Sequence, residues 1–112
     1  AFVDKFKEAY GEPPGFPAFH GYITAHFIAQ AYKKAGTMDT EKFIDAIEGL
    51  TIDSPVGPLE MRACDHQVKL PMYLGVTKMS EEYGVAISSE IETLSGDEIL
   101  PTCEEIQKAR GK

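Results

Sequence analysis

Residues 18–36 read AFHGYITAHFIAQAYKKAG and contain the longest helical pattern of the chain. Apolar side chains between residues 18 and 35 spread well beyond one stripe, so we expect a helix that is buried on more than one side. Lys33 and Lys34 lie in its last turn, where cations interact favourably with the helix dipole. Gly36 follows as a natural helix stop. The stretch therefore predicts one long, largely buried helix with a defined end.

Shorter elements are predicted on both sides of this helix. Residues 2–10 have helical spacing of their apolar side chains, and residues 40–48 have it again after Asp39, a suitable N-cap. Beyond Gly49 the pattern changes to the alternation that is typical of strands. It predicts strands at residues 56–61, 70–78 and 83–91, a polar turn at 65–67, and a short C-terminal helix after Thr102. The expected order is three helices, two or three strands and one helix.

This order places the chain of 112 residues in the α/β class, as one domain or part of one. So few strands with such short connections do not make an independent sheet. The helical pattern also begins at Phe2 without a cap or a polar lead-in. We therefore expect residues 1–112 to be the later part of a domain whose N-terminal part is missing.

Charge and hydrophobicity exclude several function classes. The net charge is −7, which argues against nucleic acid and against anionic lipid, because both need clustered Lys and Arg. Hydrophobic residues make up 43% of the chain, as in ordinary globular proteins. No apolar run approaches the ~18 residues of a membrane span. The composition indicates a globular protein that works away from nucleic acid.

Two cysteines, Cys64 and Cys103, leave two interpretations open. They are too few for a disulfide-dense scaffold, and neither belongs to a CxxC pair. They are either one disulfide or two buried thiols, and spacing alone does not choose between them.

No catalytic or metal site is predicted, and no cofactor. His20 and His26 are six residues apart on one helix, so they do not face one another as zinc ligands at helical spacing would. Cys64, Asp65 and His66 are adjacent, which is a poor arrangement for a nucleophile and its base. No glycine-rich phosphate loop follows a predicted strand.

Aromatic side chains are more informative. Phe16, Phe19 and Tyr22 gather around the N-terminus of the long helix. Helix N-termini attract carboxylates, and aromatic side chains line apolar pockets. By itself, such a cluster is equally typical of ordinary packing in an apolar core.

Three stretches follow one another along the chain: residues 19–36 with Asp39, residues 54–62, and residues 64–76. In this order they resemble the solute-binding proteins of branched-chain amino-acid (Leu/Ile/Val-type) ABC transporters. Residues 19–36 with Asp39 resemble that family's Gly-Tyr-Asp-Ala helix, and residues 54–62 resemble its Gly-Pro turn and strand. Residues 64–76 resemble its Asp-His-Gln segment and closing strand. One departure is Ile23, which stands where the family has Asp, so no polar role carries over to that position.

The resemblance implies the C-terminal portion of a type I periplasmic binding protein fold, in which two α/β lobes surround a hinged cleft. Such proteins are exported to the periplasm, are not enzymes, and deliver amino acids or related small carboxylates to a membrane permease. Tyr22 and Phe19 would contact the ligand, with the hinge near residues 54–61 and before Met72. The ligand's carboxylate and ammonium are usually held by residues earlier in the family's sequence.

Further expectations follow from the resemblance. In an oxidising compartment, Cys64 and Cys103 are expected to pair. Surfaces that normally meet the rest of the protein predict that this chain, folded alone, dimerises. Two alternative functions stay open: a ligand-sensing domain of the same fold in a signalling protein, and an enzyme whose activity would depend on His66.

Overall fold

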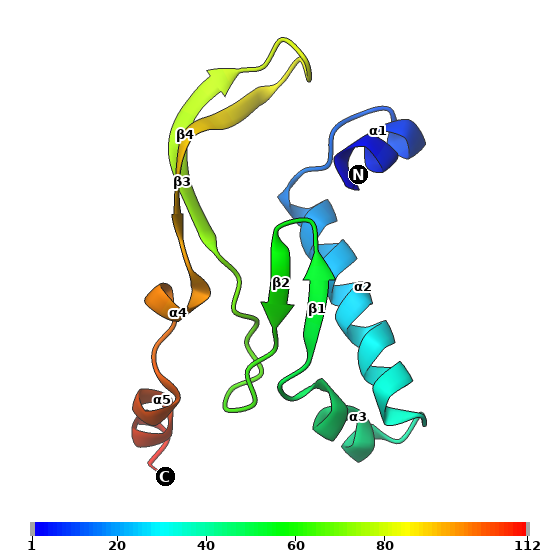
Figure 1. Cartoon of the computed structure of the whole chain (residues 1–112), viewed down its shortest axis with the longest axis vertical. Helices are drawn as coiled ribbons and strands as arrows, with labels where there is room; N and C mark the ends of the chain where they lie inside the picture. Colours follow the sequence, from blue (N-terminus) through cyan, green and yellow to red (C-terminus); the bar gives the residue numbers. More distant parts are fainter. Residues whose placement is uncertain (1, 112) are drawn as a thin grey trace. The chain divides into compact units, whose positions relative to one another are not determined.

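The computed structural model describes residues 2–111, which form two compact units, one ending at Val68 and the next beginning at Lys69. The first unit contains α1 (Phe2–Tyr10), α2 (Phe16–Ala35), α3 (Thr40–Ile47), β1 (Thr51–Ser54) and β2 (Gly57–Glu60). The second contains β3 (Met72–Met79), β4 (Ala86–Leu94), α4 (Gly96–Ile99) and α5 (Cys103–Ala109). Figure 1 labels them in chain order. The predicted α/β content is confirmed, and the strand β1 and the short helix α4 are additions to the predicted order.

Helix α2 begins earlier than predicted and ends where predicted. Its first turn starts at Phe16 because the Gly15 carbonyl accepts hydrogen bonds from the N–H groups of Ala18 at 3.1 Å and Phe19 at 3.3 Å. Proline is tolerated in this first turn, where its missing N–H would have had no helical partner. At the other end Gly36 has φ 66° and its N–H donates to the Tyr32 carbonyl, which is the predicted glycine stop.

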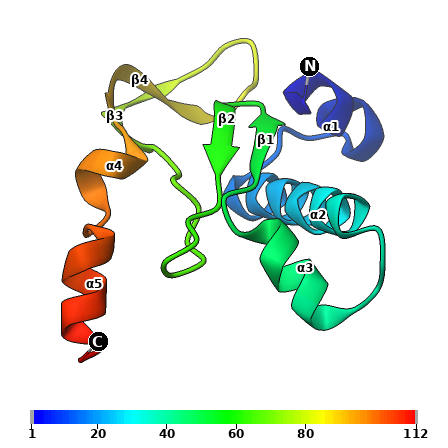
Figure 2. The same ribbon diagram turned by 60° about the horizontal axis from the view of Figure 1, so that its bottom comes forward.

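The prediction that α2 is buried on more than one side is wrong. Its buried side chains are Ile23, Phe27 and Ala31, which are four residues apart and form one stripe. Helix α3 and the β1–β2 hairpin lie along α2 (Figures 1 and 2) and are the elements of the first unit that contact it most. Ile28, on another side of the helix, is 44% exposed. The stripe is narrow because the described unit covers one side of α2.

The predicted strand at residues 56–61 is the second strand of a hairpin. Strands β1 and β2 pair antiparallel, with Ser54 opposite Gly57, so that Pro55 and Val56 make the turn. The Ser54 hydroxyl donates to the Gly57 carbonyl at 2.7 Å and accepts from the Val56 N–H at 3.2 Å. Gly57 has φ 102°, which favours glycine. The sequence pattern missed β1 because it has four residues, too few for a clear alternation.

A small apolar core forms where the hairpin faces α2. Ile52 and Leu59 are directly opposite each other in the strand pairing and are 5% and 1% exposed. The buried apolar side chains of the described residues are Ile23, Phe27, Ala31, Ala46, Ile52 and Leu59. Leu59 is the largest fully buried side chain among them, so this core depends on it.

We expect Leu59→Ala to lower the free energy of unfolding of the first unit by about 2–5 kcal/mol, the usual effect of emptying a leucine site in a core. Circular dichroism during urea titration measures the change. Leu74→Ala is the matched control, because Leu74 is 49% exposed and should cost far less. Equal losses for the two variants would contradict this description of the core.

The polar turn predicted at residues 65–67 is confirmed, and it is held by a buried ion pair. The Arg62 N–H donates to the Gln67 carbonyl at 2.8 Å, and the His66 N–H donates to the Arg62 carbonyl at 3.0 Å. The Arg62 guanidinium donates twice to the Asp65 carboxylate, at 3.1 and 2.8 Å. These two side chains are 7% and 2% exposed, so the pair lies almost entirely out of water.

The second unit is built on the β3–β4 hairpin, which pairs antiparallel from Met72 opposite Leu94 to Met79 opposite Ala86. Strand β4 begins three residues later than predicted, at residue 86, because residues 80–85 form the connecting turn, closed by a 3.0 Å hydrogen bond from the Ser80 N–H to the Val85 carbonyl. Each residue of β3 is exposed within the described chain. This hairpin therefore contributes little core of its own.

The C-terminal helix and the disulfide are both as predicted. Thr102 caps α5: its hydroxyl accepts from the Glu105 N–H, and the Glu105 carboxylate accepts from the Thr102 N–H at 2.7 Å. These bonds from the Thr102 backbone and hydroxyl hold the pKa of Glu105 below its ordinary value. Cys103, the first residue of α5, is disulfide-bonded to Cys64.

None of the helices in residues 2–111 is long and apolar enough to cross a membrane.

Candidate functional site

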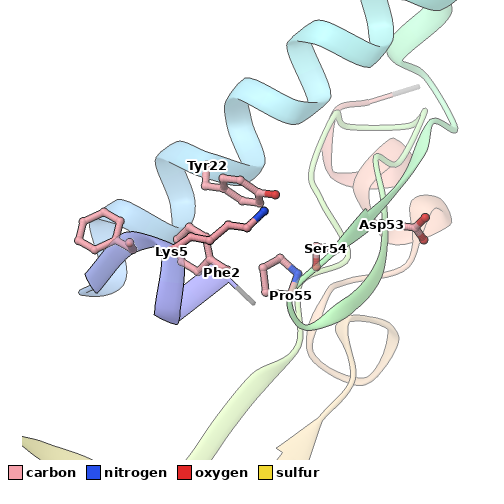
Figure 3. Close-up of a pocket in the computed structure, with 7 residues that line it drawn as sticks. Phe2, Lys5, Tyr22, Asp53, Ser54 and Pro55 are labelled. Carbon is pink, nitrogen blue, oxygen red and sulfur yellow. The ribbon is translucent and has the colours of Figure 1, made fainter. Parts of the chain in front are cut away.

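The first unit contains a pocket of about 480 Å³ that three elements line (Figure 3). Helix α1 and helix α2 contribute aromatic side chains and one lysine, and the end of β1 with its turn contributes the opposite side. The lining residues are Phe2, Lys5, Phe6, Tyr22, Asp53, Ser54 and Pro55. A volume of this size is within the range of small-molecule sites.

Helical spacing explains why α1 lines the pocket. Phe2, Lys5 and Phe6 are three and four residues apart, so they share one face of the helix. The Phe2 ring lies against the Tyr22 ring of α2, with centroids 4.7 Å apart and an interplanar angle of 43°. Aromatic pairs at this distance attract one another beyond the area they bury. This contact joins α1 to α2 and forms the aromatic wall of the pocket.

The three aromatic residues singled out in the sequence have different places. Tyr22 lines the pocket and is 37% exposed, which leaves part of its ring open to a ligand. Phe19 is outside the lining, and its ring meets the Phe2 ring edge-on at 6.3 Å. Phe16 is 76% exposed and lies against the His20 ring at 3.8 Å. The cluster is therefore divided between pocket wall, supporting ring and surface.

Sequence reasoning missed most of the lining. It gave Lys5 no role, although its spacing to Phe2 places both side chains on one side of the first helix. It placed Ser54 in a hinge segment and gave the neighbouring Asp53 no role. The missing signal was long-range: only the antiparallel pairing of β1 and β2 brings this turn to the pocket.

A second hollow of about 330 Å³ lies beside the pocket and is more polar. Its lining residues are His26, Gln30, Thr51, Ile52 and Asp53. Asp53 borders both hollows. The His26 ring lies against the Tyr22 ring at 4.4 Å, so a residue that lines the aromatic pocket contacts one that lines the second hollow.

The histidines of α2 have structural partners. His20 forms a hydrogen bond of 2.9 Å between its Nδ1 atom and the Phe16 carbonyl, and His26 stacks on Tyr22. Within residues 2–111, no group of three or more His, Cys, Asp or Glu side chains is arranged to hold a metal ion.

The neighbouring residues Cys64, Asp65 and His66 each have a separate partner. Cys64 is in the disulfide, Asp65 pairs with Arg62, and His66 Nε2 lies 2.8 Å from the Glu48 carboxylate. A cysteine in a disulfide has no thiolate to act as a nucleophile. The three side chains are therefore engaged in holding the turn.

Residues 1–82 match a family model described as "Periplasmic binding protein". Among curated proteins, the chain is 28% identical over 116 aligned residues to Leu/Ile/Val-binding protein homolog 4 of Brucella melitensis. That alignment covers 94% of this chain and 27% of the relative.

Two solved structures from Rhodopseudomonas palustris are similar in fold. One, an ABC-type branched-chain amino acid transporter of strain CGA009, has a TM-score of 0.77 and 30% identity, covering 90% of this chain and 27% of that one. The other is a solute-binding protein of strain BisB5 in complex with 3,4-dihydroxybenzoic acid, with a TM-score of 0.71, 26% identity, and 85% and 26% coverage. The chain thus spans about a quarter of the length of the proteins it matches.

Proposed function

Because the chain belongs to the periplasmic binding protein family, we propose that it is the C-terminal part of the solute-binding component of an ABC transporter. The family resemblance predicted from the three sequence stretches is confirmed. The proposed protein works in the periplasm, passes its cargo to a membrane permease, and has no turnover of its own. Residues 1–112 would then be one portion of its ligand-binding domain.

The observation that supports this proposal is the aromatic pocket of the first unit. A binding protein needs a concave site with apolar walls and few polar groups, and no reactive group is required. The pocket has this character, since Phe2, Phe6 and Tyr22 form its wall beside a single lysine, Lys5. Its cargo would be a branched-chain amino acid or a related small carboxylate. The printed names of similar proteins mention ligands of these two kinds.

Tyr22 is the proposed ligand contact, and Phe19 supports it indirectly. Tyr22 presents a partly open ring to the pocket, whereas Phe19 packs edge-on against Phe2, which in turn packs against Tyr22. In the whole protein, a ligand that touches both sides of a cleft stabilises the closed state, because only that state makes all the contacts. Residues 54–61 and the stretch before Met72 are the proposed hinge region.

Tyr22→Ala, made in the protein at its natural full length, should weaken ligand binding by roughly 10- to 100-fold, since a buried aromatic contact of this size contributes about 1.5–3 kcal/mol. Isothermal titration calorimetry with L-leucine and with benzoate measures the loss for whichever probe binds. Tyr73→Ala is the control, because Tyr73 is 46% exposed on β3 and is not among the residues that line the pocket. Unchanged affinity in Tyr22→Ala would remove Tyr22 from the site.

A further inference from the structure

The ring of Tyr22, the proposed ligand contact, lies against two other rings. The Phe2 ring of α1 has its centroid 4.7 Å away, and the His26 ring of α2 has its centroid 4.4 Å away, with an interplanar angle of 37°. Tyr22 and His26 are four residues apart on one helix, which makes them neighbours on its surface. The contact between tyrosine and histidine is therefore formed within α2 itself, and only this helix is needed to bring the two rings together.

The two residues belong to neighbouring hollows. Tyr22 lines the aromatic pocket (Figure 3), whereas the half-buried His26 lines the second, more polar hollow. Asp53 lines both of them. His26 is thus outside the lining of the pocket but in ring contact with a residue of its wall, so that it can act on a bound solute through Tyr22.

A change of charge on the histidine changes this ring contact. Histidine is the side chain that ordinarily gains or loses its charge between pH 5 and 8. A cation within about 6 Å of a tyrosine centroid is attracted by the ring, and the centroid of His26 is well inside that distance. Protonation of His26 should therefore hold the Tyr22 ring more firmly against it.

Two charged groups face this pair from the elements around α2. Among the described residues that line the two hollows, they are Asp53 of β1, in the same hollow as His26, and Lys5 of α1, in the same pocket as Tyr22. Asp53 supplies a negative charge on the side where the imidazolium would form. The ammonium of Lys5 is on the far side, in the pocket that Tyr22 lines.

We propose, building on the proposed solute-binding function, that His26 is a pH-sensitive positioning residue, which fixes the Tyr22 ring in the pocket wall when it is protonated. A side chain that is already ordered before binding loses less conformational freedom when the solute arrives. The affinity for the solute should therefore rise as the pH falls through the range in which histidine gains its proton.

Calorimetric titration of the natural full-length protein with L-leucine and with benzoate, at about pH 8 and about pH 5.5, tests this assignment with whichever probe binds. Both probes keep an ionised carboxylate over this range. The wild-type protein should bind about 2- to 10-fold more tightly at the lower pH. His26→Phe keeps an aromatic ring at the position and removes the charge, so its affinity should not rise between the two pH values.

His20→Phe is the matched control. His20 lies on the same helix, with its ring against those of Phe16 and Phe19, and its replacement should leave the gain at low pH in place. A second readout needs no ligand. The ring-proton chemical shifts of Tyr22, followed by NMR in the selectively labelled full-length protein, should change as histidine is protonated, and should lose this change in His26→Phe.

Each outcome distinguishes this inference from the function on which it rests. A gain at low pH that disappears in His26→Phe and remains in His20→Phe supports the inference. A gain that survives in His26→Phe, or a wild-type affinity without any gain, would overturn it and leave the solute-binding function standing. Absence of binding by both probes would count against the proposed function, and the Tyr22 shifts would then decide the coupling: shifts in the wild type that do not differ from those in His26→Phe would overturn it.

Discussion

Asp65→Ala is expected to lower the free energy of unfolding of the chain by about 3–5 kcal/mol, because it removes the carboxylate that pairs with the buried Arg62 guanidinium. The guanidinium is 7% exposed and makes two hydrogen bonds to Asp65, so its charge has lost most contact with water. A loss of this size is a large part of the stability of a small domain. Urea unfolding followed by circular dichroism measures it.

Two further variants test whether the cause is the loss of this charge pair. Asp45→Ala removes an exposed carboxylate from α3 and should change stability by less than about 0.5 kcal/mol. Arg62→Leu combined with Asp65→Leu replaces both charges by apolar groups and should recover most of the loss. If the double variant is as unstable as Asp65→Ala alone, the packing of the turn, and not its charge, would account for the effect.

The disulfide between Cys64 and Cys103 should have an effect of similar size. It closes a loop of ~40 residues, for which the chain-entropy relation gives roughly 3–4 kcal/mol through restriction of the unfolded chain. Replacing both cysteines by serine is expected to lower the free energy of unfolding by that amount and therefore to lower the thermal midpoint. Scanning calorimetry under oxidising conditions measures the change.

A reducing agent provides the control for this prediction. It should lower the midpoint of the wild-type chain to near that of the double serine variant, and should leave the variant itself unchanged. A wild-type chain whose midpoint is insensitive to reduction would contradict a stabilising role for the bond. The Arg62 guanidinium lies 3.5 Å from Cys64 Sγ, so replacing Cys64 changes this contact as well as the disulfide. Cys103→Ser alone removes the disulfide and keeps Cys64, which makes it a third sample.

Local sequence signals were sufficient to predict helices α1, α2, α3 and α5, although α2 begins earlier than predicted and the short helix α4 was missed. Gly36 stops α2 with a left-handed backbone, and Asp39 caps α3 by accepting from the Lys42 N–H at 3.0 Å. Thr102 and Glu105 form the predicted capping box. Each signal lies within four residues of the element it defines, which is why one sequence was enough to find it.

Features that depend on pairing between distant residues were not predicted. Strand β1 forms because it pairs with β2 across a two-residue turn, which places Ile52 opposite Leu59. The four residues of β1 show no clear pattern by themselves. The breadth of burial of α2 was overestimated, because a sequence shows which side chains are apolar and not which neighbours cover them. These are the places where tertiary contacts, and not local preference, determine the structure.

The candidate site shows the same division. Tyr22 was singled out from its place in the helix and lies in the pocket wall. Lys5 and Asp53 were not, because the pocket is formed only when α1 and the hairpin turn approach α2. The pairing of Cys64 with Cys103 was predicted from the family resemblance, since spacing alone left two interpretations open.

The most direct test of the account is a thermal-shift titration of the natural full-length protein against branched-chain amino acids and small aromatic acids. A bound ligand raises the unfolding free energy by RT ln(1 + [L]/Kd), so tight binding at 100 times Kd should add about 2.7 kcal/mol. We expect a saturable shift with one class of small carboxylate. The absence of a shift with every member of both classes would contradict a solute-binding function for this chain.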